Sequence, residues 1–255
     1  MELEHLSPSR IGTFDQCQGK YHAQYVEKKR GESHPLTNMG SGVHLMFERA
    51  TNAIQEAQRN QWDSFISPMD FKVEACKEEG VLPEHFDLVE QLTQNALDWG
   101  YFRNIERCVG VEVKFSIVLP DKTPVVGIID RLDVFKDLGE VIDLKTQKRA
   151  FDSATLHENW QARTYNMAAR HLQEIIKGRV TVSFWVLRHQ VQKVVLSADD
   201  AKRTQDDLMA KAAEIRDVTT PDYKPSGLCP WCPAFKTCAA SKEGVKKRFN
   251  RRQGK

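Results

Sequence analysis

The sequence lacks any uninterrupted apolar run approaching the roughly 20 residues that a membrane-spanning helix needs. Its first residues, MELEHLSPSR, also lack the basic-then-apolar pattern of a secretory signal. No G-x4-G-K-[ST] nucleotide-binding loop is present, so a fused helicase motor is not expected. These absences lead us to expect a cytoplasmic protein without a membrane partner. Its 255 residues, 40% of them hydrophobic, are ample for a substantial core.

Excess charge of one sign is also small, because 37 Lys and Arg face 35 Asp and Glu for a net charge of +2. The net charge therefore gives no indication of a nucleic-acid partner. The distribution is uneven, since the final segment KEGVKKRFNRRQGK carries seven Lys or Arg and one Glu. We expect residues 241–255 to form a solvated basic tail, a conformation that is compatible with phosphate contacts.

Cysteine is sparse, with six residues in the chain. Cys76 and Cys108 are isolated, and we expect each to be a small buried apolar residue. Cys17 lies near the start, and the segment CPWCPAFKTC, residues 229–238, adds three more cysteines with the spacing C-x2-C-x5-C. In a cytosolic chain this pattern favours metal or cluster ligation over disulfides. From the spacing alone, a structural zinc site with four thiolates is the first interpretation.

The hydrophobic pattern changes period along the chain. Residues 7–27, 40–62 and 68–106 have helical periodicity, the last range being interrupted around residues 78–85. Alternation with period two then predicts strands over 109–119, 125–136 and 140–146, a helix over 153–177, strands over 180–190 and 191–197, and a helix over 197–218. This order predicts an α/β fold with one mixed β-sheet flanked by helices.

Two of the predicted strands carry acidic residues where packing would favour aliphatic ones. In GIIDRLDVFKDLGEVIDLKT, Asp130 shares a strand face with Ile128 and Leu132, and Asp143 shares a face with Lys145. Burying such charges costs several kcal/mol unless they are paired or bind a metal. Mg²⁺, which prefers oxygen ligands, would offset that cost. The D-x12-D-x-K pattern alone is equally consistent with a surface salt bridge at a strand end.

Two helical patterns accompany these acids. His44 lies within GSGVHLMFE, one turn after Gly40, and QARTY places Gln161 and Tyr165 four residues apart on one helix face. Taken singly, each pattern is typical of ordinary helix packing.

The ordered combination of these patterns resembles the RecB-type branch of the PD-(D/E)XK nuclease superfamily. This branch includes the nuclease domains of RecB and AddB and the stand-alone iron–sulfur exonucleases of CRISPR adaptation. The N-terminal LSPSRIGTFDQCQGKYHAQYV is similar to the same branch, so that the resemblance runs from Leu6 to Cys238. The motifs that carry it are Gly40-x3-His44, Gly127-x2-Asp130, Asp143-x-Lys145 and Gln161-x3-Tyr165.

The resemblance implies a restriction-endonuclease-like core and a metal-dependent active site. It implies metal ligation by His44, Asp130 and Asp143, together with the backbone carbonyl of Leu144. Lys145 would be the catalytic lysine beside the two aspartates. Because an imidazole joins the carboxylates, Mn²⁺ is as reasonable a metal as Mg²⁺.

The resemblance also implies supporting residues around this centre. Gln161 and Tyr165 would position the DNA backbone and support the site. Glu112 precedes the core strands where related sequences often carry a glutamate, which makes it a further candidate.

Many members of this branch hold a [4Fe–4S] cluster with one upstream and three downstream cysteines. The set Cys17, Cys229, Cys232 and Cys238 matches that arrangement, so the resemblance favours the cluster over the zinc site. Such ligation would tie the N-terminal helix to the C-terminal segment and contribute folding free energy. The chain departs from the family after Cys17, where a proline and a basic residue are usual and Gln18 and Gly19 stand here.

These implications predict a stand-alone DNA exonuclease that hydrolyses phosphodiester bonds on single-stranded ends, in recombination, repair, CRISPR adaptation or phage DNA metabolism. A helicase or a recombination or adaptation protein could act with it, and it could form oligomers. The alternatives are a non-catalytic DNA-binding or assembly subunit and a sequence-specific endonuclease. We expect one domain over residues 1–240, with a helical insert at about 45–106, a core at about 107–197 and the cysteine segment at about 221–240, followed by the tail.

Overall fold

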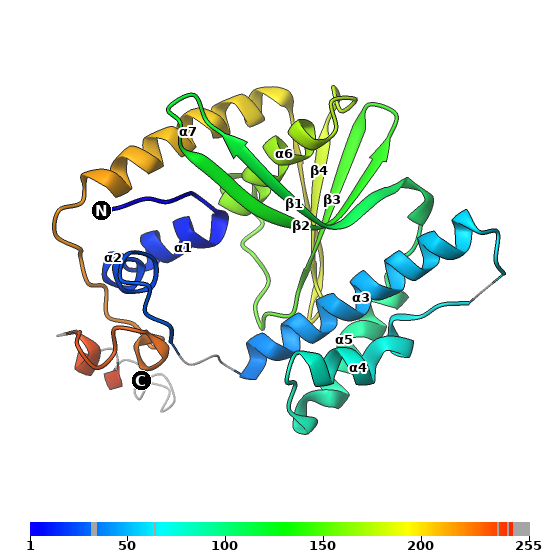
Figure 1. Ribbon diagram of the computed structural model, residues 1–255, viewed down its shortest axis with the longest axis horizontal. Coiled ribbons are helices and arrows are strands. Elements are labelled where there is room, and N and C mark those ends of the chain that lie inside the picture. Colours follow the sequence, from blue (N-terminus) through cyan, green and yellow to red (C-terminus); the bar gives the residue numbers. More distant parts are fainter. Residues whose placement is uncertain (32–34, 64, 239, 244, 247–255) are drawn as a thin grey trace. The chain divides into compact units, whose positions relative to one another are not determined.

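The computed structural model describes residues 1–31, 35–63, 65–238, 240–243 and 245–246 (Figure 1). Its packing divides the chain into two compact units, Met1–His34 with Ser116–Val126 and Gln205–Lys255, and Pro35–Phe115 with Gly127–Thr204. The single domain over residues 1–240 therefore stays a prediction. Within the predicted basic tail, residues 244 and 247–255 lie outside the described residues.

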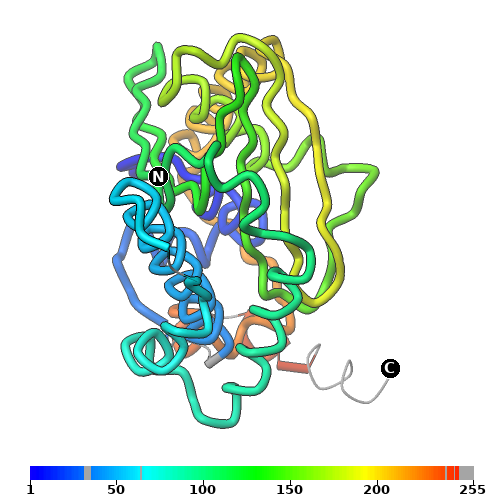
Figure 2. Tube along the Cα trace, turned by 90° about the vertical axis from the view of Figure 1, so that its right-hand side faces the viewer, coloured from blue at the N-terminus to red at the C-terminus, as the bar shows by residue number. Residues whose placement is uncertain are grey.

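The described strands form a mixed five-stranded sheet, which confirms the predicted α/β class. Strands β3 and β4 pair in parallel, whereas β2 with β3 and β4 with β5 pair antiparallel. The helix α6, Trp160–Leu172, supplies the crossover that a parallel pair requires. Figure 2 shows β3 to β5 running alongside one another. The strands, in sheet order, are β1 Cys108–Val118, β2 Pro124–Phe135, β3 Leu138–Lys145, β4 Val180–Val186 and β5 Gln190–Leu196.

Strand β2 buries both of its faces, but not as alternation alone predicts. Arg131 lies opposite Ile142 of β3, so the preceding Asp130 and the following Asp143 share the other face of the sheet. Leu132 on the Asp130 face is buried as expected, whereas Ile128 is 42% exposed. The opposite face carries Arg131 and Asp133, both buried, because they neutralise each other.

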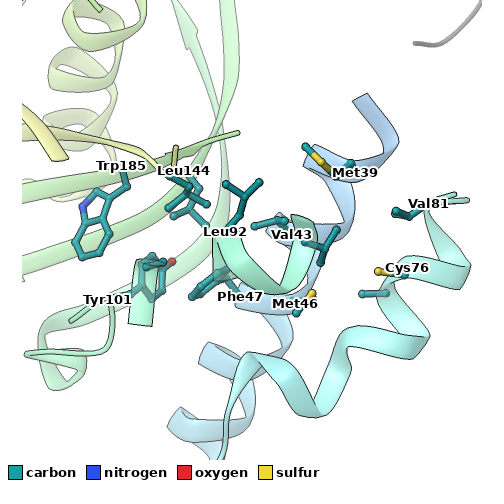
Figure 3. Packing of buried hydrophobic residues seen from close by; sticks show 14 of the residues in the cluster. Met39, Val43, Met46, Phe47, Cys76, Val81, Leu92, Tyr101, Leu144 and Trp185 are labelled. Atoms are coloured by element: carbon teal, nitrogen blue, oxygen red, sulfur yellow. The ribbon is translucent and has the colours of Figure 1, made fainter. Parts of the chain in front are cut away.

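A layer of helices packs together in the unit that contains the acidic strands. Figure 1 shows α3, α4 and α5 lying close together. In Figure 3, Phe47 of α3 lies beside Leu92 of α5, next to Leu144 and Trp185 of the sheet. Helix α3 begins earlier than predicted, at a proline, a residue suited to a helix start. The bounds are α3 Pro35–Arg59, η2 Pro68–Phe71, α4 Lys72–Glu78, η3 Pro83–His85, α5 Phe86–Asp98, η4 Ile105–Arg107 and η5 Leu156–Glu158.

The N-terminal helix begins as predicted but does not continue to residue 27. The Ser7 hydroxyl caps α1, Pro8–Gln16, by accepting a hydrogen bond from the Arg10 N–H at 3.2 Å. Cys17 then adopts an extended backbone that separates α1 from α2. The bounds of the remaining helices are α2 Gln18–Tyr21, η1 His22–Val26, α7 Ala198–Asp217 and η6 Cys229–Trp231.

Within the described ranges, no helix is both long enough and apolar enough to span a bilayer.

Candidate active site

Three potential metal ligands from three different elements converge in the structure. His44 of α3, Glu112 of β1 and Asp130 of β2 each place a ligand atom within 4.8 Å of the other two. The Nδ1 atom of His44 lies 3.3 Å from Oδ2 of Asp130. Two carboxylates and an imidazole form a donor set that fits a divalent cation such as Mn²⁺ or Mg²⁺.

Glu112 reaches this group through an unusual backbone conformation. Its φ is +47°, in the left-handed region that residues other than glycine rarely adopt. Such a departure inside a strand re-aims a side chain, as β-bulges do beside active sites. The pattern of alternation in β1 could not reveal it, and the only signal in the sequence was a glutamate shortly before the core strands.

Asp143 and Lys145 form the second half of the site, on the same face of β3. The Lys145 ammonium lies 2.5 Å from Oδ2 of Asp143, which is 1% exposed in its side chain. That oxygen accepts no well-directed hydrogen bond, so the ion pair with Lys145 offsets the cost of burying its negative charge. Asp143 is not a member of the close group of three ligands, and its metal ligation stays a prediction.

The other carboxylate oxygen of Asp143 is held by α6. The amide Nε2 of Gln161 donates to Oδ1 of Asp143 at 2.9 Å and to the hydroxyl of Tyr165 at 2.8 Å. The single Tyr165 proton is best placed on the Ile128 carbonyl, at 2.7 Å, because Asp143 Oδ1 is farther away at 3.3 Å. The structure thus joins both residues predicted from QARTY to Asp143 of β3.

A backbone contact fixes Asp130 relative to Leu144. The N–H of Leu144 donates to Oδ2 of Asp130 at 2.8 Å, the same oxygen that faces His44. This bond links the acidic positions of β2 and β3 through the peptide next to Asp143. Ligation by the Leu144 carbonyl stays a prediction.

Burial and crowded carboxylates set the charges in the site. Burial opposes the charge on His44, but the Asp130 carboxylate outweighs it and raises the pKa of His44 to about 9. Burial, reinforced by Asp130, raises the pKa of Glu112 to about 7. Burial raises the pKa of Asp143 to about 6, although the Lys145 ammonium works against that shift. Burial also opposes ionisation of Asp130, yet His44 holds its pKa below the ordinary value. A bound cation would favour the ionised carboxylates.

Two glycines of the motifs allow close packing around the site. A Cβ at Gly127 would lie 2.4 Å from the Phe115 ring, so the ring of β1 can cover β2 only because the side chain is absent. A Cβ at Gly40 would lie 3.0 Å from Oγ1 of Thr146, the residue after Lys145. These contacts explain physically why glycine stands before Asp130 and one turn before His44.

The four cysteines predicted as ligands line one pocket. Cys17 stands between α1 and α2, and the other three lie in the turns from Cys229 to Cys238. The sulfur of Cys229 accepts a hydrogen bond from the Ser226 N–H at 3.2 Å. Among the described residues, no three of these sulfurs lie within 4.8 Å of one another. Burial raises the pKa of the Cys232 thiol, and metal ligation would reverse that shift because ligands must be thiolates.

Comparisons with known proteins identify the family of the chain. The family profile of the PD-(D/E)XK nuclease superfamily matches residues 5–239, and the chain belongs to that superfamily. No curated protein matches the sequence significantly.

One solved structure supports the fold. A protein from Eubacterium rectale, provisionally named an exonuclease, aligns over 94% of this chain and 88% of its own at 12% identity, with a TM-score of 0.56. This likeness shows a shared fold. SSO0001 aligns over 75% of this chain and 82% of its own at 14% identity, but its TM-score of 0.36 carries no conclusion.

Proposed function

We propose that the chain is a divalent-metal-dependent exonuclease of the RecB-type branch, acting on single-stranded DNA ends. The observation that carries this proposal is the group His44, Glu112 and Asp130 standing beside the Asp143–Lys145 pair. Membership of the nuclease superfamily supports the reaction class. The name of the Eubacterium rectale protein adds weight to exonuclease activity.

The cation would be held by His44, Glu112 and Asp130, with Asp143 and the Leu144 carbonyl as the further predicted ligands. When bound, it supplies Lewis-acid activation of water and charge neutralisation at the scissile phosphate. Hydrolysis adds water across one P–O bond and leaves a phosphate monoester on one side of the cut and a hydroxyl on the other. Mg²⁺ and Mn²⁺ both suit this donor set.

The chain's own residues supply the remaining catalytic contributions. Lys145 is 22% exposed in its side chain, so its ammonium can reach both Asp143 and a phosphate oxygen. There it would stabilise the negative charge that develops during attack. Gln161 holds the Asp143 carboxylate in place, and Tyr165 anchors Gln161 to the backbone of β2 through Ile128. We infer that these two residues position the acid on which the reaction depends.

We further propose that Cys17, Cys229, Cys232 and Cys238 hold a [4Fe–4S] cluster. Their place around one pocket supports ligation. Four thiolates on one zinc ion would lie about 3.8 Å apart, given Zn–S bonds of about 2.3 Å. No three of the described sulfurs lie within 4.8 Å of one another, which does not match that zinc spacing. A structural zinc site is the alternative.

Nuclease activity is tested with end-labelled linear DNA and with circular single-stranded DNA, in EDTA, Mg²⁺ or Mn²⁺. We expect metal-dependent degradation of linear single strands and resistance of the circles, because an exonuclease requires an end. The Asp143→Ala variant should be inactive. Equal behaviour of wild type and Asp143→Ala would contradict the proposal. DNA binding without cleavage in any metal would favour a non-catalytic binding subunit, and cleavage of circles would favour an endonuclease.

The cluster is tested by anaerobic purification followed by iron, sulfide and zinc analysis. We expect a brown protein with broad absorbance near roughly 400 nm, and loss of that absorbance in Cys232→Ser. Cys76→Ser serves as the matched control, because Cys76 is buried in the other unit. A colourless protein with stoichiometric zinc would replace the cluster with the zinc alternative and leave the nuclease proposal standing.

A further inference from the structure

Two short loops follow the parallel strands β3 and β4 at the same edge of the sheet. The first comprises residues 146–155, which directly follow Lys145, and the second comprises residues 187–189. Together they carry Lys148, Arg149 and Arg188, which we call the basic ledge. The acidic residue of the first loop, Asp152, accepts a hydrogen bond from the Ala154 N–H within its own turn. The carboxyl ends of parallel strands are a common location for ligand sites in α/β folds.

The two loops are held together by hydrogen bonds. The N–H of Leu187 donates to the Lys145 carbonyl at 2.8 Å, and Nε of Arg188 donates to the Thr146 carbonyl at 2.8 Å. Nε2 of His189 lies 2.7 Å from the Lys148 carbonyl. The Arg188 bond uses one of its donors and leaves the fork of two terminal nitrogens for another acceptor. These hydrogen bonds therefore hold the two loops, and the basic residues on them, in fixed positions relative to each other.

The basic ledge is continuous with the proposed active site. Thr146, whose carbonyl accepts from Arg188, lines the same pocket as His44 and Glu112. Its hydroxyl also packs against α3 at Gly40. The opposite side of this pocket is acidic. It is lined by Glu48 of α3 and by Glu79, which directly follows α4.

The charges of the ledge are available for a partner. Lys148 and Arg149 are exposed and Arg188 is partly buried. Within the described part of the chain, none of the three forms an ion pair with an acidic side chain. A phosphodiester backbone approaching from the glutamate side would meet repulsion, whereas the ledge offers it three cations.

We propose that the basic ledge binds the phosphates of the DNA strand next to the cleaved linkage and guides that strand toward Lys145. This assignment rests on the proposed nuclease function and adds the direction from which the DNA strand enters the site. Arg188 can bind a phosphate through two nitrogens, while the two exposed side chains act as less specific cations. Binding through phosphates alone would be independent of base sequence.

The test measures equilibrium binding of a fluorescein-labelled single-stranded oligonucleotide in EDTA, over a range of salt concentrations. The test protein is the triple variant Lys148→Ala/Arg149→Ala/Arg188→Ala. We expect its affinity at low salt to fall roughly tenfold or more, equally for different sequences. Each phosphate contact on single strands contributes about 0.7 to the slope of log affinity against log salt, so the slope should fall by about 2.

A matched control removes the same number of positive charges elsewhere in the same unit. Lys177, Arg179 and Lys202 are exposed, and Lys177→Ala/Arg179→Ala/Lys202→Ala should bind DNA as wild type does. A second ledge variant, Lys148→Ala/Arg149→Ala, keeps the Arg188 bond to Thr146 and should show about two thirds of the slope change of the triple variant. Thermal melting of every variant separates lost binding from lost folding.

The binding readout is independent of cleavage. If ledge and control variants bind DNA equally, or if wild type does not bind it, the ledge assignment is wrong. If wild type cleaves DNA in Mg²⁺ or Mn²⁺ under either outcome, the nuclease proposal survives. If the ledge variants lose binding while wild type cleaves with no metal, the ledge stands and the nuclease proposal fails.

Discussion

His44 and Asp130 face each other across α3 and β2, with 3.3 Å between the imidazole Nδ1 and the carboxylate Oδ2. The same oxygen accepts the Leu144 N–H. This relationship joins a helix residue about 90 positions upstream to the acidic positions of β2 and β3. It also implies that a proton and a metal ion compete for the same atoms.

Metal affinity should therefore rise with pH. The raised pKa values, about 9 for His44 and about 7 for Glu112, mean that both groups hold a proton at pH 6 and that His44 still holds one at pH 8. The metal must displace a proton from each protonated ligand. For each such proton, the apparent affinity for the metal rises about tenfold per pH unit, as long as the pH is below the pKa of that ligand. Calorimetric Mn²⁺ titrations at pH 6, 7 and 8 should show the steepest rise between the first two. Glu112→Gln should bind more weakly and lose part of that rise, and a pH-independent affinity in wild type would contradict the assignment.

Lys145→Ala should separate metal binding from catalysis. Lys145 is not among the ligand atoms, but its ammonium is the cation nearest to Asp143. We expect Mn²⁺ binding to persist while kcat falls about 10²- to 10³-fold, as for the loss of one group that stabilises transition-state charge. Single-turnover cleavage and Mn²⁺ calorimetry measure the two effects. Lys145→Arg, which retains the charge, should recover part of the rate, and an unchanged kcat in Lys145→Ala would remove Lys145 from the mechanism.

Gln161→Ala should impair the site without removing any predicted ligand. The Gln161 amide donates hydrogen bonds to the Asp143 carboxylate and to the Tyr165 hydroxyl. Its loss therefore leaves the Asp143 carboxylate freer to move. We expect roughly 10- to 100-fold weaker metal affinity or activity, with little change in the melting temperature. Gln192→Ala is a useful contrast, because Gln192 bonds the Phe151 backbone in the same unit. A Gln161→Ala protein as active as wild type would show that Asp143 needs no support.

Asp133 and Asp130 should respond in opposite ways to substitution. The Asp133 carboxylate accepts hydrogen bonds from Nε and Nη2 of Arg131, each at 2.7 Å, and Arg131 is fully buried. Asp133→Ala would leave that guanidinium uncompensated and should lower the free energy of unfolding by about 3–5 kcal/mol. Urea denaturation measures this loss, while Mn²⁺ binding at low temperature should be retained. Asp130→Asn should instead abolish Mn²⁺ binding with a smaller effect on stability.

The sequence already contained most of the fold and most of the candidate site. Alternation and helical periodicity identified the five strands and the principal helices. The opposite faces of Asp130 and Asp133 follow from the period of a strand alone. His44, Gln161 and Tyr165 were found because their spacing resembles a known family.

Tertiary structure decided the rest, because local pattern carries no information about distant contacts. The inclusion of Glu112 depends on a left-handed φ that alternation cannot predict. The pairing of Arg131 with Asp133 in the interior, and of the two loops that form the basic ledge, arises only when strands are set side by side. The sequence by itself determined which residues can do the chemistry. The folded chain decided which of them meet, because it alone brings α3, β1, β2 and β3 within a few ångströms of one point.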